Sequence, residues 1–271
     1  MAATTHAGTG PEGDPPRSWW ERNAANIVLP GLTVLVTAVA GTFAALYAHG
    51  QISAADQQKI VAQQQELLTL VVDIEQEPAA EERATAPLHG TLLLNTQVQF
   101  QDELTSYAEA AQPIIGNLAK DSGVPSFEYV QVGKALAATG NNYTALTYFQ
   151  RAATAHVATP DTRAAALRNE AGVRYSLGEA GLAHRENMRA VWVFAHYPDL
   201  TRSDAGNNTA QSYLADASSE ISVGNCSIAQ ADQQAAARVL GTLPDRNRTE
   251  ATVNRVLTSD DKISYRKHCL A

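Results

Sequence analysis

Histidines, cysteines and paired acids are the residues of this chain whose types could do chemistry, and their spacing indicates which chemistry is available. The histidines lie at positions 6, 49, 89, 156, 184, 196 and 268. No two of them are four residues apart, and none has a carboxylate at metal-ligand spacing, so the local pattern predicts no zinc site. The adjacent acids Glu81-Glu82 and Asp260-Asp261 are typical of a solvated surface. Nucleophile-elbow, phosphate-loop and dinucleotide motifs are absent from the sequence, which predicts neither an enzyme nor a cofactor.

Cys226 and Cys269 are the two cysteines of the chain. In a reducing cytosol they would remain free thiols. If this part of the chain is exported, both meet oxidising conditions, and a bridge between them is the simplest outcome. We therefore expect a Cys226–Cys269 disulfide that fastens the C-terminal tail to the last helices.

The composition indicates a fold class and excludes one class of partner. The chain has 271 residues, 45% of them hydrophobic but only 6% aromatic, and a formal net charge of −8. A surface that contacts phosphates needs a basic excess, so we expect no nucleic-acid partner. The abundance of Ala and Leu favours an all-α fold.

An uncharged segment near the N-terminus predicts a transmembrane helix over residues 23–50. No Lys, Arg, Asp or Glu occurs from Asn23 to Ala55, and about 20 apolar residues suffice to cross a bilayer. Trp19, Trp20 and Tyr47 flank the apolar run, where aromatic rings favour the headgroup level. A buried core helix and a cleaved signal peptide are the alternatives. Residues 1–22 before the segment are rich in Gly, Pro and Thr, which predicts a disordered tail.

Basic residues near this segment set its expected orientation. Arg17 and Arg22 precede it closely, whereas Lys59 is the one basic residue soon after it. The bias places the N-terminus in the cytoplasm and the C-terminal domain outside, in a single-pass protein of the cell membrane. The reverse orientation, with the C-terminal domain cytoplasmic, is the alternative.

Residues 51–121 form an acidic region that we expect to be a helical stalk. Residues 51–110 contain ten acidic side chains against Lys59 and Arg83. Apolar residues at helical spacing mark a buried stripe on a helix over 52–77, which Pro78 should end: Ile60, Leu67, Leu68, Val71, Val72 and Ile74. This stripe would either pack against the following helices or join two copies as a homo-oligomer.

A second helix is expected from about residue 88 to 111, with Pro113 at its end or at a kink. Its expected buried side consists of Leu92, Leu93, Val98, Phe100 and Leu104.

Residues 122–271 contain an internal repeat. A shift of 38 residues, from Gly140 to Gly178, also aligns Ala145 with Ala183, Arg151 with Arg189, Ala152 with Ala190, and Pro160-Asp161 with Pro198-Asp199. A fainter third copy retains Gly224, Ala229, Ala236 and Pro244-Asp245. Each unit is predicted to be a helix, a left-handed glycine turn and a second helix, with small alanines where the two helices meet.

The first unit resembles the tetratricopeptide repeat family. It contains the pattern Tyr129-x2-Val132-Gly133-x2-Leu136, followed by Ala145-x3-Phe149 and Ala152. The second unit retains Ala171-Gly172-x2-Tyr175 and Ala183, but has Arg168 in place of the first aromatic residue and Asn187 in place of the Phe. The third unit retains Tyr213, Gly224, Ala229 and Ala236.

This resemblance implies stacked helical hairpins, closed by a C-terminal capping helix, that bind a protein or peptide partner on a concave surface. Lys134, Arg168 and Tyr175 are the expected contacts in that groove, because the first helix of each unit lines it. An unrelated helical bundle is the alternative fold. The sequence thus favours a membrane-anchored interaction module; the alternative is a membrane-tethered enzyme or effector whose site is built from non-adjacent residues.

Overall fold

The computed structural model describes residues 54–121, 123–195, 202–243 and 269. These residues form eight α-helices and no β-strand, which confirms the predicted all-α class for the described part of the chain. The helices are α2 (Ala54–Thr85), α3 (Gly90–Asp121), α4 (Ser126–Ala138), α5 (Asn142–Thr154), α6 (Pro160–Ser176), α7 (Ala180–Ala195), α8 (Arg202–Ser222) and α9 (Cys226–Gly241).

Among the described residues, none of the helices combines the length and apolarity needed to cross a bilayer. The predicted transmembrane segment 23–50 and the tail 1–22 lie outside the described residues. Residues 244–268 and 270–271 also lie outside the described residues, so nothing described tests the predicted C-terminal capping helix.

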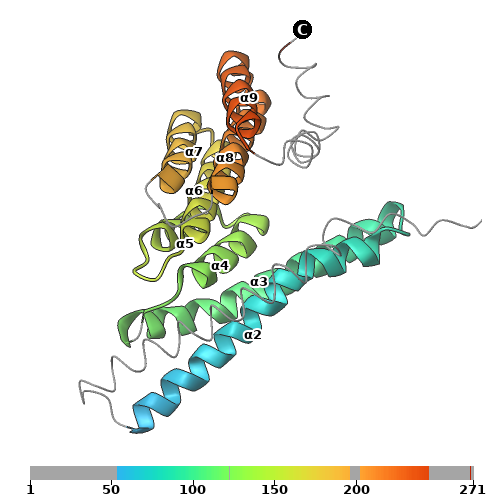
Figure 1. Cartoon of the computed structure of the whole chain (residues 1–271). Coiled ribbons are helices and arrows are strands. Elements are labelled where there is room, and N and C mark those ends of the chain that lie inside the picture. Colours follow the sequence, from blue (N-terminus) through green and yellow to red (C-terminus); the bar gives the residue numbers. More distant parts are fainter. Residues whose placement is uncertain (1–53, 122, 196–201, 244–268, 270–271) are drawn as a thin grey trace, which may run out of the picture. The chain divides into compact units, whose positions relative to one another are not determined.

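The helices pair into successive hairpins, α2 with α3, α4 with α5, α6 with α7, and α8 with α9 (Figure 1). The second helix of each hairpin packs against the first helix of the next, and α4 and α6 contact each other, as do α6 and α8. Helix α4 also contacts α2, and residues 52–271 belong to one compact unit. The acidic region is therefore packed directly against the first repeat hairpin.

Glycines make the turns inside the three repeat hairpins. Gly140, Gly178 and Gly224 have φ angles of 82°, 79° and 81°, a left-handed conformation that other residues adopt only with strain. The predicted glycine turns are thus confirmed.

The predicted small residues of the repeat lie at the centre of each hairpin. All six aligned alanines have 0% exposure: Ala145, Ala152, Ala183, Ala190, Ala229 and Ala236. Their spacing of seven residues places each pair on one face of a helix, where the absence of a larger side chain permits close helix approach.

The predicted helix end at Pro78 was wrong, and of the two alternatives for Pro113, an end or a kink, the end is excluded. Helix α2 continues through Pro78 to Thr85, and α3 continues through Pro113 to Asp121. A proline inside a helix costs about 3 kcal/mol because it removes a hydrogen bond and crowds the preceding turn. In α3 that cost is offset by apolar burial just after the proline, where Ile115 and Leu118 are 0% and 1% exposed.

The apolar stripe of α2 is buried within one chain. Four of its residues are at most 5% exposed, and α2 packs along α3: Ile60, Leu67, Val71 and Ile74. The expected buried side of α3 is only partly right. Leu104 is buried there and Leu93 and Phe100 are half-buried, but Leu92 and Val98 are exposed.

Candidate functional site

An open pocket of about 370 Å³ lies where α4, α5 and α6 meet, and its lining includes Lys134 and Arg168. We call it the α4–α6 pocket. The remaining lining is small or neutral, and includes Ala137, Ala138 and Gly172. Two of the three expected groove residues are therefore brought together by the fold.

The two cations of this pocket differ in how strongly they are held. Lys134 is exposed as a residue, yet desolvation of its ammonium group lowers its pKa, an effect opposed by Glu75 of α2 and reinforced by Arg168. Arg168 is half-buried, and its Nη1 donates a hydrogen bond to Ser212 Oγ at 3.1 Å. Burial lowers the pKa of Arg168, and the charge of Asp161 opposes that shift. The Arg168 side chain is thus fixed by a hydrogen bond to α8, whereas the exposed Lys134 side chain is free to adjust its position to a ligand.

Tyr175, the third expected groove residue, is not available to a ligand in the groove. It is only 8% exposed. Its hydroxyl donates to Asp216 Oδ1 at 2.9 Å and to Glu220 Oε1 at 2.7 Å, both on α8. The sequence-based assignment of Tyr175 to the groove is corrected accordingly, because its partners lie at the interface of α6 with α8.

Tyr175 belongs instead to a group of polar residues with a buried centre, which we call the polar cluster. Its members come from α6, α7, α8, the α8–α9 turn and α9: Tyr175, His184, Asn187, Asp216, Glu220, Asn225 and Asp232.

Asp216 is the centre of the polar cluster and is 0% exposed. Besides the Tyr175 hydroxyl, it accepts a hydrogen bond from Asn187 Nδ2 at 2.7 Å. His184 Nδ1 lies 2.5 Å from Asp216 Oδ2 and 3.7 Å from Glu220 Oε1. The cluster therefore gathers two carboxylates, an imidazole and a phenol.

Acidic side chains are concentrated in the buried centre of the polar cluster. Burial, a hydrogen bond with Asp216 and the charges of Asp216 and Glu220 raise the pKa of Asp232 to about 7, while His184 opposes the shift. Burial and the same two carboxylates of α8 raise the pKa of Tyr175 far above its ordinary value. Tyr175 is thus held as a neutral hydrogen-bond donor.

The polar cluster was missed by the sequence analysis, although two signals pointed to it. Asn187 occupies the repeat position that Phe149 holds in the first unit, which places an amide where an apolar ring is expected. Asp216 and Glu220 are four residues apart, so they lie on one face of α8. Local spacing does not reveal the histidine, because His184 is 32 residues from Asp216 in sequence.

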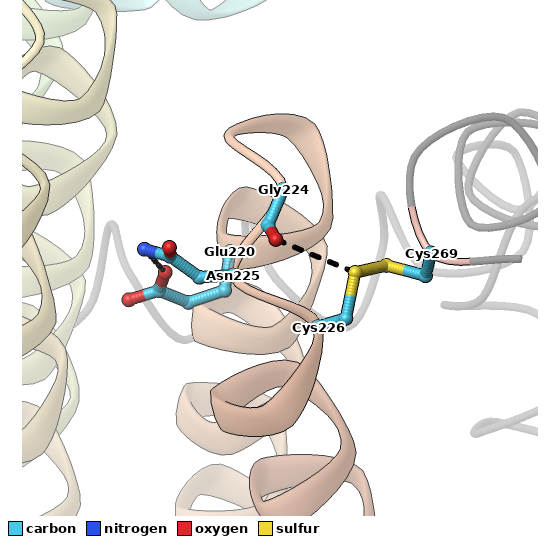
Figure 2. Close-up of a disulfide and its surroundings, with 5 residues drawn as sticks. All are labelled: Glu220, Gly224, Asn225, Cys226 and Cys269. Atoms are coloured by element: carbon cyan, nitrogen blue, oxygen red, sulfur yellow. Dashed lines mark hydrogen bonds between the residues drawn. A yellow bond between two sulfur atoms is a disulfide. The ribbon is translucent and has the colours of Figure 1, made fainter. Parts of the chain in front are cut away.

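The predicted Cys226–Cys269 disulfide is confirmed, with Cα atoms 5.5 Å apart and a sequence separation of 43 residues (Figure 2). Cys226 begins α9 directly after Asn225, whose Nδ2 donates to Glu220 Oε2 at 2.5 Å. The disulfide and the polar cluster therefore meet at the turn between α8 and α9.

Comparison of this chain with protein-family models, with curated proteins and with solved structures found no match.

Proposed function

We propose that this protein is a membrane-anchored interaction module whose helical hairpins bind a protein or peptide partner through the α4–α6 pocket. The observation that carries the proposal is the convergence of Lys134 and Arg168 on one pocket with small, neutral walls. Two neighbouring cations repel each other, so a partner that brings a carboxylate between them relieves that repulsion. The partner is an acidic segment of a protein or peptide.

The arrangement of hairpins supports this reading. The glycine turns, the buried alanines and the contacts between successive first helices are features expected of stacked repeats. Tetratricopeptide-type repeats use such stacks to hold extended peptides, and the resemblance of the first unit to that family is the basis for choosing binding.

The anchor and the topology are part of the proposal. Residues 23–50 hold the chain in the cell membrane, and residues 51–271 lie outside it. The disulfide supports the location of residues 51–271 outside the cell, because disulfides persist in oxidising compartments and are rare in the cytosol. The apolar stripe of α2 is already buried against α3, so a single chain suffices as the binding unit.

Binding is preferred to catalysis because of how the polar cluster is buried. Asp216 and Glu220 are 0% and 1% exposed, so a substrate would have to displace packed helices to reach them. The α4–α6 pocket is open, and the hydroxyl of Ser176, which lines it, donates its hydrogen bond to the Val173 carbonyl oxygen.

The test uses the full-length protein, purified in detergent, as bait for partners from its native membrane fraction. An acidic peptide of the captured partner is then titrated against wild type and against the double variant Lys134→Glu/Arg168→Gln. Affinity should fall by about tenfold or more, because the variant removes both pocket cations and introduces a repelling charge. Arg168 is changed to the neutral Gln because a second acid beside Asp161 would also destabilise the fold.

The matched control is Lys59→Glu/Arg238→Gln, which makes the same change in net charge at exposed positions on α2 and α9. This control should bind like wild type in moderate salt. Equal affinity of wild type and the pocket variant would refute the proposal, as would equal weakening by the control.

A further inference from the structure

The polar cluster contains more buried negative charge than the described residues neutralise. Asp216, Glu220 and Asp232 are 0%, 1% and 6% exposed. Within the described part of the chain, no Lys or Arg forms an ion pair with them, and His184 is the ion-pair partner of Asp216 and Glu220. Burying carboxylates without opposite charge costs several kcal/mol each, so either protons or a cation must accompany them.

One buried amide oxygen of the cluster, Asn187 Oδ1, has no hydrogen-bond partner within the described ranges, and its side chain is 1% exposed. The Nδ2 atom of the same amide donates to Asp216 Oδ1, so Asn187 is part of the cluster. Asp232 shares a hydrogen bond with Asp216. Buried polar atoms are nearly always paired, so the unpaired amide oxygen is consistent with a ligand bound in the cluster.

The donor atoms are close enough to share one metal ion. A ring nitrogen of His184 and carboxylate oxygens of Asp216 and Glu220 all lie within 4.8 Å of one another. The separation of 3.7 Å between His184 Nδ1 and Glu220 Oε1 is near the roughly 3.3 Å between two ligands of a tetrahedral zinc ion. The His184 side chain is 33% exposed, which gives an ion access from solvent.

The surrounding residues provide the outer support that metal sites use. The Tyr175 hydroxyl and the amides of Asn187 and Asn225 donate to the two carboxylates of α8, which holds those carboxylates toward one another. Asp216 and Glu220 come from the same face of α8, and His184 comes from α7, so an ion here would bridge two repeat hairpins.

We propose that His184, Asp216 and Glu220 bind a divalent transition-metal cation, with Zn²⁺ as the best-matched ion, the two carboxylates balancing its charge and Asp232 as an adjacent acid. An imidazole ligand favours Zn²⁺ over Ca²⁺ and Mg²⁺, which prefer oxygen ligands. The ion is structural: it replaces the direct contact of His184 with Asp216 and fastens α7 to α8. This inference does not depend on the proposed docking function.

The experiment uses full-length protein in detergent, treated with a chelator and then titrated with ZnCl₂ by calorimetry. Binding of one Zn²⁺ per chain is expected, with a rise in the thermal midpoint, while MgCl₂ produces neither. The variant His184→Gln should weaken zinc binding by about 100-fold or more, since it removes the nitrogen ligand. The control His156→Gln changes an exposed histidine outside the cluster and should bind zinc like wild type.

Absence of both the heat of binding and the thermal shift would overturn the proposal, as would unchanged affinity in His184→Gln. If that variant does not fold, X-ray absorption spectroscopy of the zinc-loaded wild type decides. One imidazole with oxygen ligands supports the site, whereas two or more imidazoles or a sulfur ligand overturn it.

Discussion

Gly133 on α4 lies against the ring of Phe149 on α5, so closely that a Cβ atom added at Gly133 would come within 2.7 Å of Phe149 Cε1. Phe149 is only 1% exposed, so its ring is part of the core that the added Cβ would crowd. The glycine of the repeat pattern is therefore required here for packing, since α4 is an ordinary helix at this point and needs no special backbone conformation.

We predict that Gly133→Ala lowers the free energy of unfolding by about 1–3 kcal/mol, because the added methyl group overpacks the hairpin. Gly172 is the matching residue of the second unit, and an added Cβ there meets nothing within 4 Å. Gly172→Ala should instead stabilise by about 0.4–1 kcal/mol, through reduced freedom of the unfolded chain. Chemical denaturation of the two variants and wild type measures both effects. Equal behaviour of the two variants would contradict the packing argument.

A second prediction concerns Glu128, which is 4% exposed on α4. Burial raises the pKa of its carboxyl from 4.5 to about 8. The folded state thus retains a proton that the unfolded state releases between these values, so this residue's contribution to stability falls as pH rises from about 4.5 to 8. At pH 8, Glu128→Gln should be more stable than wild type by a few kcal/mol, and at pH 4.5 the difference should vanish. Urea unfolding across this pH range tests it, and a constant difference would argue against a buried neutral carboxyl.

The disulfide should contribute about 4 kcal/mol, because it closes a loop of 43 residues and restricts the unfolded chain. Reduction of wild type is expected to shift the denaturant midpoint to lower concentration. The double variant Cys226→Ser/Cys269→Ser provides the control, since its denaturant midpoint should equal that of reduced wild type and should not change when reductant is added. A wild-type midpoint that does not respond to reduction speaks against a stabilising bridge.

The proposed anchor can be tested with Val36→Arg. An arginine near the centre of a spanning helix costs about 2.5–3.5 kcal/mol of insertion free energy, so the protein should leave the membrane pellet after sedimentation. Val157→Arg adds the same charge at an exposed position between α5 and α6 and should stay in the pellet. Wild-type protein in the soluble fraction, or Val36→Arg that remains in the pellet, would exclude the anchor.

The features that the sequence determined by itself are local and periodic. Glycine turns at Gly140, Gly178 and Gly224 follow from the conformational freedom of that residue, which acts within a few positions of the chain. The alanines seven residues apart mark a helical face before any packing is known. The disulfide was predictable because the chain has just two cysteines.

Tertiary structure decided whatever depends on contacts between distant residues. Pro78 and Pro113 disfavour an isolated helix, but α2 and α3 continue through them, and in α3 the burial of Ile115 and Leu118 offsets the local penalty. The repeat pattern predicts Tyr175 to be a groove residue. Its hydrogen-bond partner Glu220 lies 45 residues away on α8, and contact with that helix determines that the Tyr175 side chain faces the interior. The polar cluster arises the same way, because only stacking of hairpins brings an imidazole from α7 against two carboxylates of α8 and removes both carboxylates from bulk water.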